Sequence, residues 1–247
     1  MKRPILAFAL AGLTALPAGA LDIDAMTDAE RAAFRSEIRA YLLENPEVLM
    51  EAIDVLEARE ASSQAETDAA LVKANYDALV RDGHSWIGGN PDGDITIVEF
   101  LDYRCGFCKR AFPEVEELVT TDGNIRIIIK EFPILGPQSD LASRFAIATK
   151  MVAGDDAYKA VHDALMGFRG QVSEASLSRL AVDQELDGEA IMAQMQSAEI
   201  DEIIDQNRDL ARAMQITGTP TFVIGGQMLR GFLPLEGMRE LVSEERS

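Results

Sequence analysis

The stretch from Ile95 to Cys108 reads Ile-Thr-Ile-Val-Glu-Phe-Leu-Asp-Tyr-Arg-Cys-Gly-Phe-Cys and carries the main fold signal. Its first six residues, 95–100, are a β-branched apolar run of strand length. Two cysteines follow directly, and residues 111–119 continue as a helix. After a turn, residues 125–132 form a second apolar run of strand length. Strand, helix and strand within about forty residues predict a βαβ unit with parallel strands.

The C-terminal half combines a long helical stretch with a short hairpin. Helical patterns fill residues 138–215, and glycines interrupt them near 154, 167–170 and 187–188. Two short strands, 221–224 and 227–231, are joined by Gly225-Gly226, which predicts a hairpin. A helix over 235–242 closes the chain. We therefore predict an α/β fold in which a helical insertion separates the βαβ unit from the hairpin.

Residues 1–20 have the pattern of a secretory signal peptide. Lys2 and Arg3 precede an apolar stretch from Ile5 to Leu16, and Ala18-Gly19-Ala20 supplies the small-x-small cleavage site. The alternative is a membrane anchor, but the stretch is shorter than the ~20 apolar residues that span a bilayer. We predict cleavage after Ala20 and export of the protein.

Residues 27–81 have helical patterns throughout. Thr27 and Glu30 form a capping box at the start of the first helix. Asn45-Pro46 ends that helix and predicts a second one, with Asn45 as its N-cap and Pro46 at its first position. The polar stretch 57–68 is either an exposed helix or a flexible connector.

An apolar seam runs along these predicted helices. Leu42, Leu49, Ile53 and Leu56 recur at heptad-like spacing over about two heptads, fewer than the three or four that indicate a coiled coil. The segment 21–82 is thus either a helical arm folded back on the main domain or an oligomerisation stalk. The seam leaves both interpretations open.

The charge balance excludes several classes of partner. The 247 residues include 23 basic and 42 acidic side chains, a net charge of −19. Nucleic-acid binding needs clustered Lys and Arg, so no nucleic-acid partner is expected. The same balance argues against binding to an anionic membrane surface.

The cysteine count favours redox chemistry. An exported protein that relied on disulfides for stability would carry several scattered cysteines. This chain has only Cys105 and Cys108, and a bridge between them would close too small a loop to stabilise the fold much. A structural zinc site would need four ligands, yet the two histidines, His84 and His162, lie far apart in sequence. We therefore predict no metal site and no cofactor.

The position of the two cysteines assigns their roles. Cys105 lies where the strand leads into a helix, so the unpaired N–H groups of the first turn stabilise its thiolate. Cys108 lies one turn later and is more shielded, which makes it the resolving cysteine. Arg104, Lys109 and Arg110 surround the motif; they either help to stabilise the thiolate or are ordinary surface cations.

Glu99 interrupts an apolar strand, where burial of an unpaired carboxylate is costly. We interpret Glu99 as a buried acid that exchanges a proton with Cys108. The alternatives are that Glu99 faces solvent or pairs with Lys130 on the next strand. Pro220 stands at the start of a strand, where proline is tolerated, and base rates alone predict a trans peptide bond before it.

Three motifs resemble a known family. The segment 99–109 resembles the active site of DsbA-like thiol–disulfide oxidoreductases on the thioredoxin fold, and 130–136 and 218–222 are similar to further segments of that family. The resemblance covers about residues 84–245. It implies a thioredoxin-like domain over 83–247 with its helical insertion at about 138–215.

The resemblance also implies a set of site residues. Pro220 is expected to be cis and to pack against the cysteines, and the Thr219 backbone is expected to bind substrate chain. Gly106 and Phe107, between the cysteines, are expected in the same substrate-binding surface. Glu99 matches the family's buried acid.

The segment 41–49 looks like the N-terminal segment of suppressor-of-copper-sensitivity C (ScsC) proteins, some of which are trimers. This resemblance implies a periplasmic enzyme, a possible homotrimer, client proteins with cysteines, and a membrane redox partner. Gly-Phe between the cysteines and Thr219 before the proline depart from the DsbA type member, and this threonine looks more like the disulfide isomerases. Three alternatives follow: an isomerase or reductase linked to copper tolerance, a Cu(I)-binding factor, and a chaperone-like module with incidental cysteines.

Overall fold

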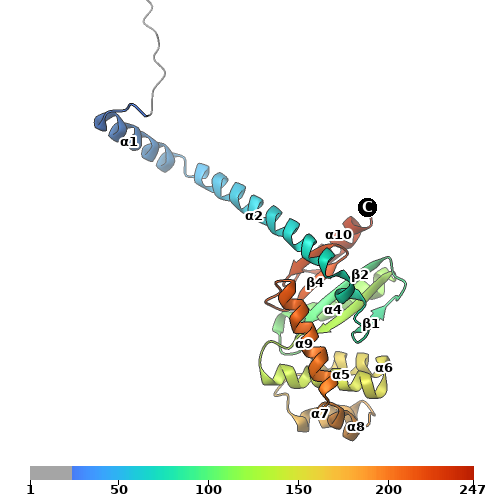
Figure 1. Cartoon of the computed structure of the whole chain (residues 1–247). Coiled ribbons are helices and arrows are strands. Elements are labelled where there is room, and N and C mark those ends of the chain that lie inside the picture. Colours follow the sequence, from blue (N-terminus) through green and yellow to red (C-terminus); the bar gives the residue numbers. More distant parts are fainter. Residues whose placement is uncertain (1–23) are drawn as a thin grey trace, which may run out of the picture. The chain divides into compact units, whose positions relative to one another are not determined.

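The structure is a computed structural model and describes residues 24–247 (Figure 1). The signal peptide predicted for residues 1–20 lies outside the described residues. The chain divides into two compact units, the first ending at Arg59 and the second spanning Glu60–Ser247. Within residues 24–247, we find no helix with the length and apolarity that a bilayer span requires.

The first unit contains helix α1, Asp28–Glu44, and the start of α2, Glu47–Ala74. The predicted capping box is confirmed: the Thr27 hydroxyl accepts from the Glu30 N–H at 3.3 Å, and the Glu30 carboxylate accepts from the Thr27 N–H at 2.9 Å. The predicted N-cap role of Asn45 is wrong. Its side-chain amide donates to the Tyr41 carbonyl at 2.8 Å, so it caps the end of α1, and α2 starts one residue after Pro46.

Helix α2 runs without a break through the polar stretch 57–68, which is therefore a helix rather than a connector. Residues 57–67 are exposed, and Asp68 is buried and pairs with Arg230 at 2.7 Å. Its last turns and the short helix α3, Tyr76–Val80, belong to the second unit, where Val72 and Leu79 are buried. The division at 59/60 differs from the boundary at 82/83 that we expected from sequence. The reason is that these apolar side chains join the core of the sheet.

The second unit is built on a five-stranded sheet with the order β1-β3-β2-β4-β5. The strands are β1 Trp86–Gly89, β2 Ile95–Leu101, β3 Ile125–Glu131, β4 Thr221–Ile224 and β5 Gln227–Arg230. The parallel pairing of β2 with β3 and the β4–β5 hairpin are both confirmed. Strand β1 was not predicted, because half of its four residues are glycines and it pairs only at the edge, antiparallel to β3.

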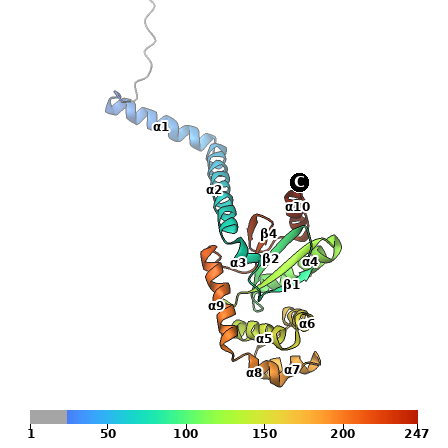
Figure 2. The same ribbon diagram turned by 45° about the vertical axis from the view of Figure 1, so that its right-hand side comes forward.

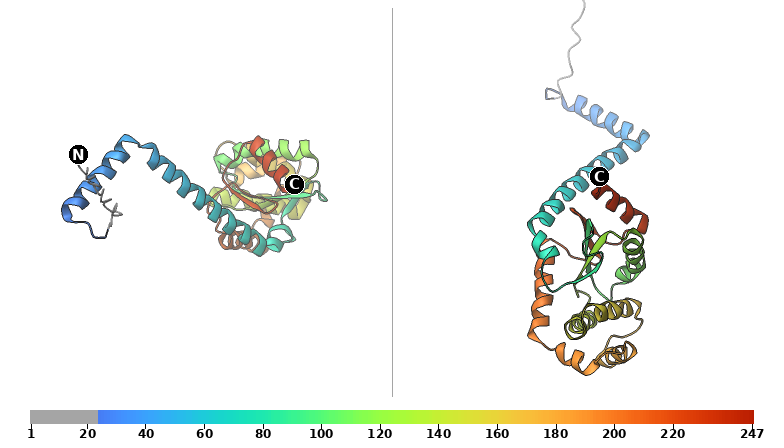
Figure 3. Two further views of the ribbon diagram at one scale, coloured as in Figure 1. Left: turned by 90° about the horizontal axis from the view of Figure 1, so that it is seen from above. Right: turned by 90° about the vertical axis from the view of Figure 1, so that its right-hand side faces the viewer.

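Helices cover both faces of the sheet. Helix α4, Gly106–Asp122, and helix α10, Leu235–Glu245, lie on one face, and α3 and α9, Ala198–Ala213, lie on the other (Figure 3). The side chains of β2 alternate between the two cores, since Ile97 and Leu101 join the first and Val98 and Phe100 the second. Burial on both faces explains why β2 is a continuous apolar run.

The predicted helical insertion consists of five helices between β3 and β4. Four of them, α5 to α8, group together, and α9 leads back along the sheet (Figure 2). Their bounds are α5 Pro137–Ala153, α6 Asp155–Gly167, α7 Glu174–Asp183 and α8 Gly188–Gln194. The predicted breaks are confirmed, and a further break separates α8 from α9. The α/β fold with a helical insertion and preceding helices is therefore as predicted.

Candidate active site

Cys105 is the N-cap of α4, at the point where β2 leads into that helix. The Cys105 Sγ lies 3.1 Å from the Thr219 carbonyl oxygen, which accepts from the protonated thiol. Hydrogen bonds from the Cys108 thiol, the Thr219 side chain and the first backbone N–H groups of α4 favour the thiolate and outweigh the effect of burial. They lower the pKa of Cys105 to about 5.

Cys108 lies one turn along α4 and is fully buried, whereas Cys105 is 6 % exposed. The hydrogen bond that Cys108 donates to Cys105, its burial, and the nearby Glu99 carboxylate all raise the pKa of the Cys108 thiol far above its usual range. Both cysteines are free thiols in this structure. One helical turn thus places a sulfur that ionises readily next to one that stays protonated.

Glu99 lies on the face of β2 that also carries Ile97 and Leu101, toward the core that contains both cysteines. Its side chain is only 3 % exposed, and its Oε1 has no hydrogen-bond partner in the described part of the chain. Burial, and then the charges of Glu116 and Cys105, raise the pKa of Glu99 to about 8. The carboxyl group is therefore mostly protonated at neutral pH.

The two alternatives for Glu99 are wrong. Since the side chain is buried, it does not face solvent. Lys130, on the neighbouring strand, instead forms an ion pair with Asp82 and donates to the Ala78 carbonyl at 2.9 Å. Lys130 belongs to the opposite face of the sheet, because successive side chains of a strand point to opposite faces.

The Thr219–Pro220 peptide bond is cis, as the family resemblance implied and base rates did not. Pro220 is buried, and the preceding carbonyl is the one that contacts Cys105. Gly106 and Phe107 are exposed, with 60 % of the phenyl side chain open to solvent. The structure thus brings Cys105 and Thr219 into direct contact, and it exposes Phe107 in the first turn of α4.

A second buried carboxylate, Glu131, was missed by the sequence analysis. It ends β3 and accepts three hydroxyl hydrogen bonds: from Tyr103 at 2.7 Å, Tyr158 at 2.6 Å and Ser143 at 2.7 Å. Burial outweighs these donors and raises the pKa of Glu131 to about 7. An acidic residue inside an apolar strand, the signal that identified Glu99, was also present here. Its hydroxyl partners come from three other segments and carry no local signal.

His162 on α6 adjoins the Glu131 group. Its Nδ1 lies 3.0 Å from the Tyr103 hydroxyl, and its ring stacks on those of Trp86 and Tyr158. Burial, with a smaller effect of Lys159, lowers the pKa of His162 to about 3, so the ring is neutral. Across residues 24–247, no cluster of three or more His, Cys, Asp and Glu side chains could hold a metal ion.

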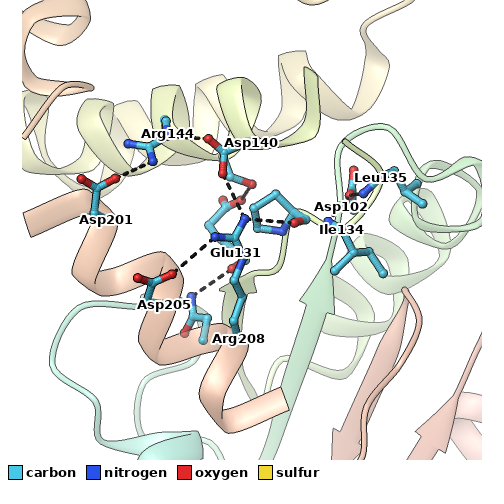
Figure 4. A network of polar contacts seen from close by, with 12 residues as sticks. Asp102, Glu131, Ile134, Leu135, Asp140, Arg144, Asp201, Asp205 and Arg208 are labelled. Carbon is cyan, nitrogen blue, oxygen red and sulfur yellow. Dashed lines mark hydrogen bonds and ion pairs between the residues drawn. The ribbon is translucent and has the colours of Figure 1, made fainter. Parts of the chain in front are cut away.

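Asp102 fixes the loop beside the cysteines. Its buried carboxylate accepts from the backbone N–H group of Arg104 at 2.7 Å. It also accepts from those of Ile134 at 2.8 Å and Leu135 at 3.0 Å, which lie beside it in Figure 4. Arg208 on α9 donates to the Pro133 carbonyl of the same loop at 3.5 Å and pairs with Asp140 at the start of α5 at 3.1 Å. Exposed apolar side chains at 134 and 135 are therefore held next to the motif.

The comparisons with known proteins agree with this site. The family model described as the DSBA-like thioredoxin domain matches residues 96–243, and the chain belongs to that family. A second model, the N-terminal domain of the copper resistance protein ScsC, matches residues 30–62. The predicted kinship with DsbA-like and ScsC proteins is confirmed.

Solved structures resemble the chain over most of its length. A thioredoxin-like oxidoreductase from Silicibacter pomeroyi DSS-3 is 38 % identical, covers 70 % of this chain and 98 % of its own, and has a TM-score of 0.66. Proteus mirabilis ScsC in a transitional conformation is 26 % identical, with coverage of 89 % and 98 % and a TM-score of 0.65. Among curated relatives, the Na(+)/H(+) antiporter NhaA 1 of Salinispora arenicola is 29 % identical over 64 % of this chain. The match spans only 24 % of the antiporter's length.

Proposed function

We propose that the protein is an exported thiol–disulfide oxidoreductase that exchanges disulfides with cysteines of other proteins through Cys105 and Cys108. The observation that carries the proposal is the contrast between the two sulfurs: the pKa of Cys105 is lowered to about 5, and that of Cys108 is raised by burial and by its bond to Cys105. A stable thiolate beside a protonated thiol is what reversible disulfide exchange requires. Family membership supports the same reading.

In the oxidising direction, a client thiolate attacks Cys105 of the Cys105–Cys108 disulfide. A bond forms between the client sulfur and Cys105, the enzyme disulfide breaks, and Cys108 leaves with the electron pair. Glu99, protonated at neutral pH, then supplies a proton to the Cys108 thiolate. This role explains why an otherwise costly buried acid stands in β2.

A second client thiolate then attacks the client sulfur of the mixed disulfide. The client leaves with a disulfide, Cys105 leaves as a thiolate, and the enzyme has gained two electrons. Because the lowered pKa of Cys105 makes it a good leaving group, this step is favoured. A membrane redox partner would then reoxidise Cys105 and Cys108 to the disulfide. This step would take place in the periplasm if residues 1–20 direct export, as their pattern predicts.

The test is turnover with a reduced, unfolded protein that needs one disulfide. The oxidised full chain should form that disulfide and become reduced in equal amount, as quantified by mass spectrometry after alkylation. Variants Cys105→Ala and Cys108→Ala should both lose turnover. If either variant retained it, the proposed chemistry would be wrong.

Isomerisation is the second candidate, and the threonine at 219 favours it, since it resembles the residue found before that proline in disulfide isomerases. In that direction, reduced Cys105 attacks a wrong bridge of the client and is released when the client re-pairs. Refolding of a scrambled-disulfide protein by the reduced chain would identify an isomerase. A Cu(I) titration of the reduced chain separates both from a copper-binding factor, for which tight binding without either activity is expected.

A further inference from the structure

Four cationic side chains surround the catalytic motif. Arg104 directly precedes Cys105, Lys109 and Arg110 lie in the first turns of α4, and Arg169 lies in the loop between α6 and α7. Arg104, Arg110 and Arg169 are exposed, and Lys109 is half-buried. Burial, followed by the charges of Arg104 and Arg169, lowers the pKa of Lys109, so these three cations lie close together.

None of these four cations belongs to an ion pair formed within residues 24–247. Arg104 donates to the Gly170 carbonyl at 2.6 Å, and Lys109 donates to the Phe168 carbonyl. The guanidinium of Arg110 lies over the Phe232 ring, 4.5 Å from its centroid. Carbonyl and ring contacts orient a cation but leave its charge uncompensated.

The chain has 42 acidic and 23 basic residues, so most cations could find a carboxylate. Elsewhere in the second unit, Arg246 contacts both Asp94 and Asp122, and Arg144 contacts both Asp140 and Asp201. Arg126 and Arg179 also lack an ion pair among the described residues, but each of them contacts a backbone carbonyl away from the motif. The face around Cys105 is therefore locally cationic on a protein of net charge −19.

The same face exposes apolar side chains. Phe107 lies between the cysteines, and Ile134 and Leu135 are held beside the motif by Asp102. An extended client segment that reaches Cys105 would thus meet apolar surface and unpaired positive charge. Apolar contact does not discriminate strongly among unfolded clients. Charge does discriminate, because like charges that meet at an interface repel each other.

We propose that this cationic face, formed by Arg104, Lys109, Arg110 and Arg169, selects client segments with acidic residues next to the reacting cysteine. The inference rests on the proposed thiol–disulfide exchange and names its substrate class. The cationic face should attract an acidic client, whereas the net charge of −19 taken alone would repel it. The two electrostatic effects therefore predict opposite client preferences.

The test uses two synthetic dithiol peptides that differ only in having Glu or Lys beside each cysteine. The oxidised full chain oxidises each peptide, and every rate is divided by the rate with uncharged dithiothreitol. We expect the Glu peptide to react about tenfold faster than the Lys peptide at low salt, the order expected for electrostatic steering. High salt should reduce the ratio toward one.

Variants isolate the contribution of the protein. In Arg110→Glu/Arg169→Glu, the ratio of the Glu rate to the Lys rate should fall about tenfold. Comparing ratios removes the effect of flanking charge on the peptide thiols themselves. Lys73→Glu is the matched control: Lys73 is exposed, has no carboxylate partner among the described residues, and lies on α2 next to Val72, which packs in the core on the opposite face of the sheet. It should keep the wild-type ratio.

The outcomes separate the two proposals. Equal peptide rates, a faster Lys peptide, or an unchanged ratio in the double variant would overturn the selectivity while leaving disulfide exchange intact. Failure to oxidise both peptides and dithiothreitol would contradict the proposed function itself.

Discussion

Three titratable side chains around α4 have pKa values displaced in the directions that disulfide exchange needs. Donors at the start of α4 hold Cys105 as a thiolate, burial and its bond to Cys105 hold Cys108 as a thiol, and burial keeps Glu99 protonated. The three groups interact, so each pKa depends on the state of the other two. Each can nevertheless be tested separately.

Cys105 should be the cysteine that iodoacetamide labels in the reduced protein. Its labelling rate should rise to a plateau above about pH 6, because the thiolate fraction is nearly complete one unit above a pKa of about 5. An ordinary thiol would keep gaining reactivity up to about pH 9. Mass spectrometry of the labelled protein measures both the site and the rate. Preferential labelling of Cys108 would reverse the assigned roles.

Glu99→Gln should slow disulfide exchange on the order of 10²-fold at neutral pH, because the amide cannot supply a proton to Cys108. Stopped-flow rates across pH check this. Glu117→Gln is a control, since that carboxylate also lies on α4 but is exposed and pairs with Arg239 at 3.2 Å. A pH–rate profile of Glu99→Gln identical to that of the wild type would leave Glu99 without a catalytic role.

The same substitution should stabilise the fold at alkaline pH. Because the folded pKa of about 8 is above the unfolded value of about 4.5, the favourable contribution of protonated Glu99 is complete below about pH 4.5 and is lost as pH rises through about 8. Glu99→Gln avoids that loss, so its free energy of unfolding at about pH 9 should exceed that of the wild type by roughly 1–3 kcal/mol. Urea unfolding measures the difference, and a less stable variant at alkaline pH would contradict it.

Among the elements, β3 connects the helical insertion to the active-site loop through Glu131. Its carboxylate binds Ser143 of α5, Tyr158 of α6 and Tyr103 of the β2–α4 connection. A single buried group thus holds three segments together. Hydrogen bonds to a buried carboxylate are stronger than hydrogen bonds between neutral groups, and a buried carboxylate oxygen that loses its donor destabilises the fold.

Tyr158→Phe should therefore lower the free energy of unfolding by roughly 1.5–3 kcal/mol, since it removes one donor to Glu131 and keeps the ring. Tyr76→Phe, on α3, is the matched control because that tyrosine is largely exposed. Its effect should stay within about 0.5 kcal/mol in the same urea titration. Equal effects of the two substitutions would show that the Glu131 group does not stabilise the fold.

The elements that sequence predicted well were those with local signals. Strand β2, α4 and the hairpin each have apolar spacing or turn residues of their own, and the capping box of α1 lies within four residues. The misassigned Asn45 shows the limit: an asparagine between two helices can cap either one, and geometry rather than spacing decides. The Glu131 group was missed because its hydroxyl donors are distant in sequence.

At the scale of the whole molecule, the exposed apolar side chains of the first unit suggest that it binds another chain. Of the predicted seam, Leu49, Ile53 and Leu56 are exposed and share one face of α2 by their spacing of four and three residues, whereas Leu42 on α1 is half-buried. An exposed apolar helix face of this kind indicates an interaction site. Joining several catalytic domains would also raise the local thiol concentration around one client, which favours isomerisation.

We therefore expect residues 21–247 to form a homotrimer in solution. Leu49→Glu/Ile53→Glu should convert it to a monomer, because charges on the seam cannot be buried between copies. Val182→Glu, on the exposed surface of α7, is the control and should leave the trimer intact. Light scattering gives the mass of each. A monomeric wild type, or a trimer that persists in the double variant, would mean that the seam does not join copies.

The extent of each unit could not be read from sequence. The change from helical to strand patterns at residue 83 is real, but packing of Val72 and Leu79 on the sheet places the end of α2 with the catalytic unit. The sequence contained both residues without indicating what they contact. Glu99 was identifiable because it interrupts an apolar strand, the two cysteines because of their number and spacing, and the proline motif because it resembles a family segment.

The most direct test of disulfide exchange through Cys105 is a trapping experiment with the full chain. Cys108→Ala removes the resolving thiol, so a disulfide-linked client or oxidised glutathione should form a mixed disulfide that persists. We predict that intact mass and peptide mapping place this adduct on Cys105, and that the wild-type chain releases it to give the Cys105–Cys108 disulfide. The absence of an adduct in Cys108→Ala, or comparably fast formation of one on Cys108 in Cys105→Ala, would contradict the account.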